Sequence, residues 1–229
     1  MQREQLAKFQ KQIDSAIIGF LNLLDRKELL AKSIDFNSSL SKLNSSIQKS
    51  ILTIQDTLYA SLMVDIHAWL FDSSHNSSNS SLYKLLKLLV DRETKLNTKH
   101  LKRCYVTAPE VVTLNESVSN WQSEFTHMRE TEFEQVLSSC AEKINCLLLS
   151  EQAERIKSLR DKFLAHKDGA YDVKSNGHKI GDVFYLLEHM KIILIDLNAL
   201  FQRVSYPIDE SEASAKESAQ VYWSHVART

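Results

Sequence analysis

The stretch SEQAERIKSLRDKFLAHKD, residues 150–168, is the most informative segment of this chain. Wound as a helix at about 3.6 residues per turn, it gathers its apolar side chains on one broad face, as in a helix that packs against a core. These side chains are Ala153, Ile156, Leu159, Phe163 and Leu164. Ser150 is a suitable N-cap, and the carboxylate of Glu151 suits the positive end of the helix dipole. The stretch therefore predicts an amphipathic helix.

Arg160 is the exception on this helix, because the helical wheel places it in the middle of the apolar face. A guanidinium is seldom buried without a partner, since its desolvation costs several kcal/mol. Arg160 is therefore expected to reach solvent along its stem, to pair with a carboxylate, or to face a polar cleft. His166 lies six residues further along, at the border of the same face and near Gly169, a suitable helix terminator. The two residues would present a permanent cation and a titratable imidazole.

The residues from Arg160 to His166 resemble the R-x(4–6)-H signature of the HEPN superfamily, and most closely its abortive-infection and toxin branch. In that signature a polar residue commonly follows the arginine, and small and apolar residues precede the histidine. An arginine followed by a histidine at this distance also arises by chance, so the resemblance depends on this context and on the helical pattern around it. It implies an all-α fold, an antiparallel helical bundle of the HEPN type, here with long N-terminal helices.

The resemblance also implies a metal-independent endoribonuclease that needs no cofactor and acts as a homodimer, with both Arg–His pairs lining one cleft. His166 would serve as general base or acid at the 2′-hydroxyl or the leaving 5′-oxygen. Arg160 would bind the scissile phosphate and stabilise its added negative charge. Asp161 would orient Arg160 or His166, while Lys162 and Lys167 would hold flanking RNA phosphates or remain solvated. The expected products carry 2′,3′-cyclic phosphate and 5′-hydroxyl ends, and an antitoxin or other defence-system protein is a possible partner.

Two positions depart from the family pattern. Asp161 stands where asparagine is frequent, and Asp168 stands where a subgroup of toxins carries a modified tyrosine, so that regulation is not transferred. Two other interpretations remain open: a non-catalytic helical scaffold that binds RNA, a nucleotide or a protein, and an unrelated bundle with a chance motif. An enzyme requires Arg160 and His166 to converge on a solvent-accessible cleft, whereas a scaffold predicts that both are buried and paired.

Composition limits the class of protein. The chain has 229 residues, of which 43% are hydrophobic, which suits one sizeable all-helical domain over 1–229. Only 4 glycines and 2 prolines interrupt it, which predicts long helices. A net charge of -1 excludes a generic polyanion-binding protein but leaves room for a local basic cleft. Three cysteines without a CxxC pair indicate neither a disulfide framework nor structural zinc, and favour a cytoplasmic location.

Apolar periodicity predicts the other elements. Helices are expected over 5–30, 39–71, 117–148 and 182–204, with Asp182 as an N-cap, and a tail helix is expected within 208–229. Val221, Tyr222 and Trp223 of the tail are expected to dock on this subunit or on a partner. The Ser- and Asn-rich segment 72–81 predicts a flexible loop. No segment is apolar enough to span a membrane or to serve as a signal peptide.

Other chemistries find little support. The sequence has no HExxH motif and no histidine with Cys, Asp or Glu at ligand spacing, so no metal site is expected. It has no glycine-rich phosphate loop, which argues against ATP- or NAD-dependent activity. His67 lies on an apolar helix face and is interpreted as a core histidine with its polar groups satisfied. The helix over 150–168 is left as the candidate for chemistry.

Overall fold

A computed structural model describes residues 2–72, 81–90, 102–103, 105–107, 118–161, 179–201 and 206–226. In these residues the structure is helical and contains no strand, which confirms the all-α prediction. The elements are α1 (Gln2–Asp35), the 3-10 helix η1 (Phe36–Lys42), α2 (Ser45–Phe71), α3 (Leu82–Val90), α5 (Val118–Leu148), α6 (Glu151–Leu159), α7 (Ile180–Phe201) and α8 (Ile208–Val226).

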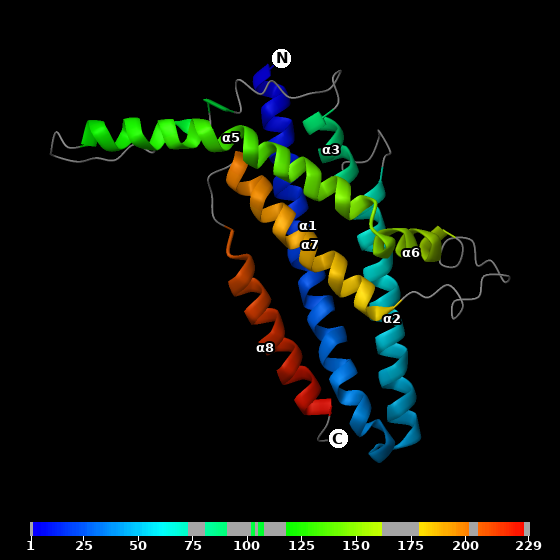
Figure 1. Ribbon diagram of the computed structural model, residues 1–229. Coiled ribbons are helices and arrows are strands. Elements are labelled where there is room, and N and C mark those ends of the chain that lie inside the picture. The colour runs from blue at the N-terminus through cyan, green and yellow to red at the C-terminus, as the bar shows by residue number, and fades with distance from the viewer. Residues whose placement is uncertain are drawn as a thin grey trace.

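The two long N-terminal helices form an antiparallel hairpin, as their apolar stripes predict (Figure 1). Helix α1 packs along α2, α7 and α8, and α5 crosses the bundle against α3 and α7. The short helix α6 contacts α2 and α7 and sits at one side of the bundle, beside the C-terminal part of α2 (Figure 1). The residues predicted to form the site at the end of α6 therefore lie beside the hairpin, at its edge.

One connected core draws apolar side chains from every α-helix of the described residues. Phe20 of α1, Leu62 of α2 and Phe133 of α5 are among its fully buried members. Helix α7 contributes a nearly continuous buried series, Val183, Leu186, Leu187, Met190, Ile193, Leu194, Leu197 and Leu200. Removing this apolar area from water provides the main favourable free energy of folding, and it fixes the rotation of each helix about its axis.

The corner between α1 and α2 differs from the expected boundaries. Helix α1 continues to Asp35, and α2 begins at Ser45 rather than at residue 39. Asn44 is the N-cap of α2, because its side chain accepts a hydrogen bond of 2.8 Å from the backbone N–H of Ser46. The intervening residues form the 3-10 helix η1. Gln55 holds this corner by donating to the backbone oxygen of Ser33 at 2.8 Å.

The C-terminal helix α8 lies along α1 (Figure 1). Trp223 is buried and donates from Nε1 to the backbone oxygen of Leu29 at 2.9 Å, so this part of the docking prediction is confirmed. Val221 and Tyr222 are exposed, so they do not dock on this subunit, and their docking on a partner stays a prediction. Consecutive helical residues point about 100° apart, so only one of these three neighbours can face α1.

Two further expectations concern the segment 72–81 and the presence of a membrane-spanning helix. Residues 73–80 of the expected loop lie outside the described residues. At its ends, Ser81 donates a hydrogen bond of 2.6 Å to the backbone oxygen of Asp72. Within the described residues, no helix combines the length and the apolar character needed to cross a membrane.

Candidate active site

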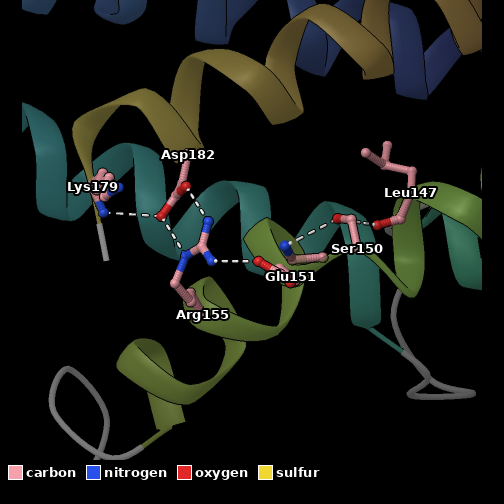
Figure 2. Close-up of polar contacts among 7 residues, drawn as sticks. Leu147, Ser150, Glu151, Arg155, Lys179 and Asp182 are labelled. Carbon is pink, nitrogen blue, oxygen red and sulfur yellow. Dashed lines mark hydrogen bonds and ion pairs between the residues drawn. The ribbon is translucent and has the colours of Figure 1, made fainter. Parts of the chain in front are cut away.

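Helix α6 is positioned at its start by Ser150. The Ser150 hydroxyl accepts a hydrogen bond of 3.2 Å from the backbone N–H of Ala153 and donates one of 2.7 Å to the backbone oxygen of Leu147 (Figure 2). This geometry confirms Ser150 as the N-cap and ties the first turn of α6 to the last turn of α5. Glu151 lies in that first turn, where a carboxylate stabilises the free backbone N–H groups.

An ion pair then fastens α6 to α7. Arg155 donates from Nε and Nη2 to the two carboxylate oxygens of Asp182, at 2.9 and 2.7 Å, and Glu151 lies 3.3 Å from its Nη1 (Figure 2). Asp182 is nearly fully buried. Burial tends to raise the pKa of Asp182, but hydrogen bonds from Arg155 and from the backbone N–H of Lys179 outweigh it and lower the pKa. The sequence interpretation did not single out Arg155.

The start of α7 differs from the predicted one, in which Asp182 is the N-cap. The helix begins at Ile180, so Asp182 is its third residue and not its N-cap. Its carboxylate accepts a hydrogen bond of 2.9 Å from the backbone N–H of Lys179, just ahead of the helix (Figure 2). An acid at this position satisfies a free N–H by reaching back, as in a capping box. Asp182 therefore stabilises the start of α7 and holds α6 with the same carboxylate.

The apolar face of α6 ends at two of the predicted site residues, Arg160 and Asp161. Ala153, Ile156 and Leu159 are buried, and residues 160–161 continue the helix in a wider π turn, a feature often found at functional sites. Arg160 donates from Nη1 to Oδ1 of Asp161 at 2.9 Å. The side chains of Arg160 and Asp161 remain 40% and 43% exposed. Arg160 thus avoids burial without a partner on the apolar face, because its guanidinium pairs with a carboxylate and reaches solvent.

His67 of α2 faces this pair. Its Nε2 lies 3.7 Å from Oδ1 of Asp161, its side chain is 13% exposed, and its ring packs 5.3 Å from the ring of Phe71. Burial and then the positive charge of Arg160 lower the pKa of His67, and Asp161 opposes them. The interpretation of His67 as a core residue needs correction, because the ring lies at the edge of the core beside a polar pair. The signal available in the sequence was the position of His67 on the helical wheel, where it lies beside the buried stripe that contains Ile66 and not within that stripe.

The comparison with known protein families bears on these residues. A family model described as AbiU2, of the HEPN group, matches residues 22–222. The chain belongs to the AbiU2 family of HEPN proteins. The match runs from within α1 to within α8, and it confirms the resemblance drawn from the residues around Arg160. No curated protein and no solved structure matches the chain.

The structure describes only part of the stretch from Arg160 to His166 that carries the resemblance. The structure brings Arg160 and Asp161 together and places His67 beside them. Lys162, His166 and Lys167 lie outside the described residues, so the roles assigned to them stay predictions. Within the part of the chain that the structure describes, His, Cys, Asp and Glu side chains form no group suited to hold a metal ion.

Proposed function

We propose that this AbiU2-family protein is a metal-independent endoribonuclease of the HEPN type. The observation that supports the proposal best is the position of Arg160, a half-exposed guanidinium at the end of a helix that is otherwise fastened into the core. A cation held in this way is available to a polyanion while its backbone stays fixed. Family membership adds the expectation of a role in abortive infection.

Arg160 is suited to exchange its partner for an RNA phosphate. An ion pair exposed to water contributes only about 0–1 kcal/mol, so leaving Asp161 costs the guanidinium little. A phosphodiester offers two oxygens to the planar fork of an arginine, in charge-assisted hydrogen bonds. In the transition state the phosphate gains negative charge, and Arg160 stabilises that charge more strongly than it stabilises the substrate.

His166 completes the proposed mechanism. An imidazole can take the proton of the 2′-hydroxyl or donate one to the leaving 5′-oxygen, because its ordinary pKa lies near neutral pH. Attack of the 2′-oxygen on the phosphorus breaks the bond to the 5′-oxygen, which leaves a 2′,3′-cyclic phosphate and a 5′-hydroxyl end. Asp161 orients Arg160 before RNA binds, and Lys162 and Lys167 hold the flanking phosphates.

The proposal includes the assembly and its setting. Two protomers pair so that both motif helices border one cleft in the cytoplasm, and an antitoxin or other defence-system protein controls the activity. The scaffold alternative predicts that Arg160 and His166 are both buried and paired; Arg160 is paired with Asp161 but is not buried. The exposure of Arg160 favours the enzyme over that alternative.

The test is RNA cleavage in the presence of EDTA. Wild-type protein, Arg160→Ala and His166→Ala are incubated with total RNA and with tRNA, and the new RNA ends are identified. We expect cyclic-phosphate ends from the wild type and a loss of rate of about 100-fold or more in both variants, since each removes a group that acts on the reacting phosphate.

Matched controls separate the site from general charge and fold. His127→Ala removes an exposed histidine of α5, and Lys49→Ala removes an exposed cation near the start of α2. Both controls should cleave at the wild-type rate, and circular dichroism should show all variants folded. A folded wild type that leaves every RNA intact would refute the nuclease and support a binding scaffold.

A further inference from the structure

His67 and Arg160 contact the same carboxylate from two helices. Oδ1 of Asp161 lies 2.9 Å from Nη1 of Arg160 and 3.7 Å from Nε2 of His67. The first distance is a hydrogen bond, and the second is too long for one. A small rotation of the Asp161 side chain away from Arg160 would close the second distance. The carboxylate therefore has a second partner within reach.

The ring of His67 is held in place for this contact. It packs against Phe71 one turn along α2, and Lys157 of α6 covers the Phe71 ring at 5.6 Å from its centroid. The side chain of His67 is 13% exposed, compared with 43% for Asp161. Of these two groups, the carboxylate is the one that has room to move.

Burial and the nearby cations keep His67 neutral near pH 7. Burial, Arg160 and Lys157 lower its pKa, while Asp161 and Asp72 raise it, and the net direction is downward. A neutral imidazole with its proton on Nε2 donates a hydrogen bond to a carboxylate and adds no cation that would compete with Arg160 for phosphate. If RNA phosphate neutralised Arg160 and released Asp161 toward His67, both changes would favour the protonated ring.

We infer that His67 is a positioning residue of the Arg160 site. When an RNA phosphate displaces the Asp161 carboxylate from the guanidinium of Arg160, His67 receives that carboxylate. The inference rests on the proposed function, because it assigns the RNA phosphate as the group that displaces Asp161. His67 does not touch the substrate in this scheme. It acts by giving the displaced carboxylate a hydrogen-bond donor and keeping it away from the bound phosphate.

The direct test follows the imidazole of His67 by NMR and needs no catalytic activity. In the free protein, Arg160→Ala should raise the pKa of His67 and Asp161→Asn should lower it. A 2′-O-methyl RNA oligonucleotide, which cannot be cleaved through its 2′-oxygen, should raise the pKa of His67 by about half a unit or more in the wild type. The same oligonucleotide should have a smaller effect in Asp161→Asn. If the pKa of His67 changes neither in Asp161→Asn nor with saturating oligonucleotide, the inference is overturned.

Kinetics separate this inference from the nuclease proposal. His67→Gln keeps a hydrogen-bond donor and should retain most of the wild-type kcat/KM, while His67→Phe keeps the ring but no donor and should lose about 10-fold. Equal rates for wild type and His67→Phe would contradict the positioning role. A wild type that cleaves no RNA, but in which the oligonucleotide still raises the pKa of His67, would refute the nuclease proposal. It would support the movement of Asp161 from Arg160 to His67 in a site that binds RNA without cleaving it.

Discussion

Glu212 is a buried carboxylate with lysines around it. Lys27 of α1 lies 2.7 Å from Oε1, Lys191 of α7 lies 2.8 Å from Oε2, and Lys216 lies 3.3 Å from Oε1. Burial tends to raise the pKa of Glu212, but the hydrogen bonds from Lys191 and Lys27 outweigh it and lower the pKa to about 2. One side chain of α8 thereby joins that helix to both α1 and α7.

Glu212→Gln should destabilise the protein by about 2 kcal/mol at pH 7, because Lys27 and Lys191 lose their charge-assisted hydrogen bonds to the shared carboxylate, while Glu28 still pairs with Lys27 and Asp209 with Lys191. The pKa is lowered on folding, so the stability that it provides is complete above the ordinary value of 4.5 and is lost as the pH falls toward about 2. The difference between wild type and Glu212→Gln in the free energy of unfolding should therefore shrink over that pH range. Urea unfolding at several pH values measures it.

Glu217→Gln is the matched control for this prediction, because Glu217 is an exposed glutamate of the same helix. It should change the free energy of unfolding by less than about 0.5 kcal/mol at any pH. A wild type and a Glu212→Gln variant with the same stability at pH 7 would show that the three lysines gain nothing from the buried carboxylate.

Helix α6 depends on its ion pair with α7 for its placement. It is short, and its apolar face consists of three buried side chains, so packing alone gives it limited stability. Arg155 and Asp182 add a two-point contact that fixes the rotation of α6 relative to α7 (Figure 2). The position of Arg160 at the far end of α6 follows from that rotation.

Arg155→Ala should cost about 3 kcal/mol of folding stability, because it leaves the buried carboxylate of Asp182 without its cation. Adding Asp182→Asn to this variant should recover part of the loss, and the double-mutant cycle gives the coupling between the two residues. Chemical denaturation measures each variant. Glu151→Gln is the control: Glu151 is 88% exposed, so its removal should cost less than about 1 kcal/mol. Additive effects of the two main substitutions would contradict the coupling.

The whole bundle is closed along α1 by the C-terminal helix. Helix α8 buries Ile208, Ala215, Ala219 and Trp223, and it supplies Glu212 to the ion pairs with α1 and α7. Phe36, at the turn after α1, packs 6.2 Å from the ring of Trp223. The last helix is therefore part of the folded unit that presents α6.

A chain that ends at Tyr206 should lose at least about 5 kcal/mol, which approaches the total stability of a typical domain. The reason is the exposure of the α1 surface that α8 covers, together with the loss of Glu212, which pairs with Lys27 and Lys191. Thermal unfolding followed by circular dichroism measures the effect, and a chain that lacks only residues 227–229 is the control. A truncated chain with an unchanged, cooperative transition would show that α8 is an independent appendage.

Local pattern was sufficient for much of the fold. The apolar stripes predicted the long helices of the hairpin and the helices α5 and α7, and Ser150 was recognised as an N-cap from its type and place. Boundaries were less accurate where several residues could cap a helix, as between Asp35 and Asn44. There the choice depends on which side chain reaches a free N–H in the folded corner, and residue type does not specify this.

For the candidate site, the sequence by itself determined the helix, the anomalous Arg160 and the family. Only the tertiary structure decided that His67 faces Asp161, that Arg155 pairs with Asp182, and that Glu212 gathers its lysines. The physical reason is the distance along the chain over which each feature is set. A helical stripe is a property of neighbouring residues, whereas an ion pair between helices depends on their relative rotation and offset to within a fraction of a turn. Packing of the whole core sets that rotation and offset.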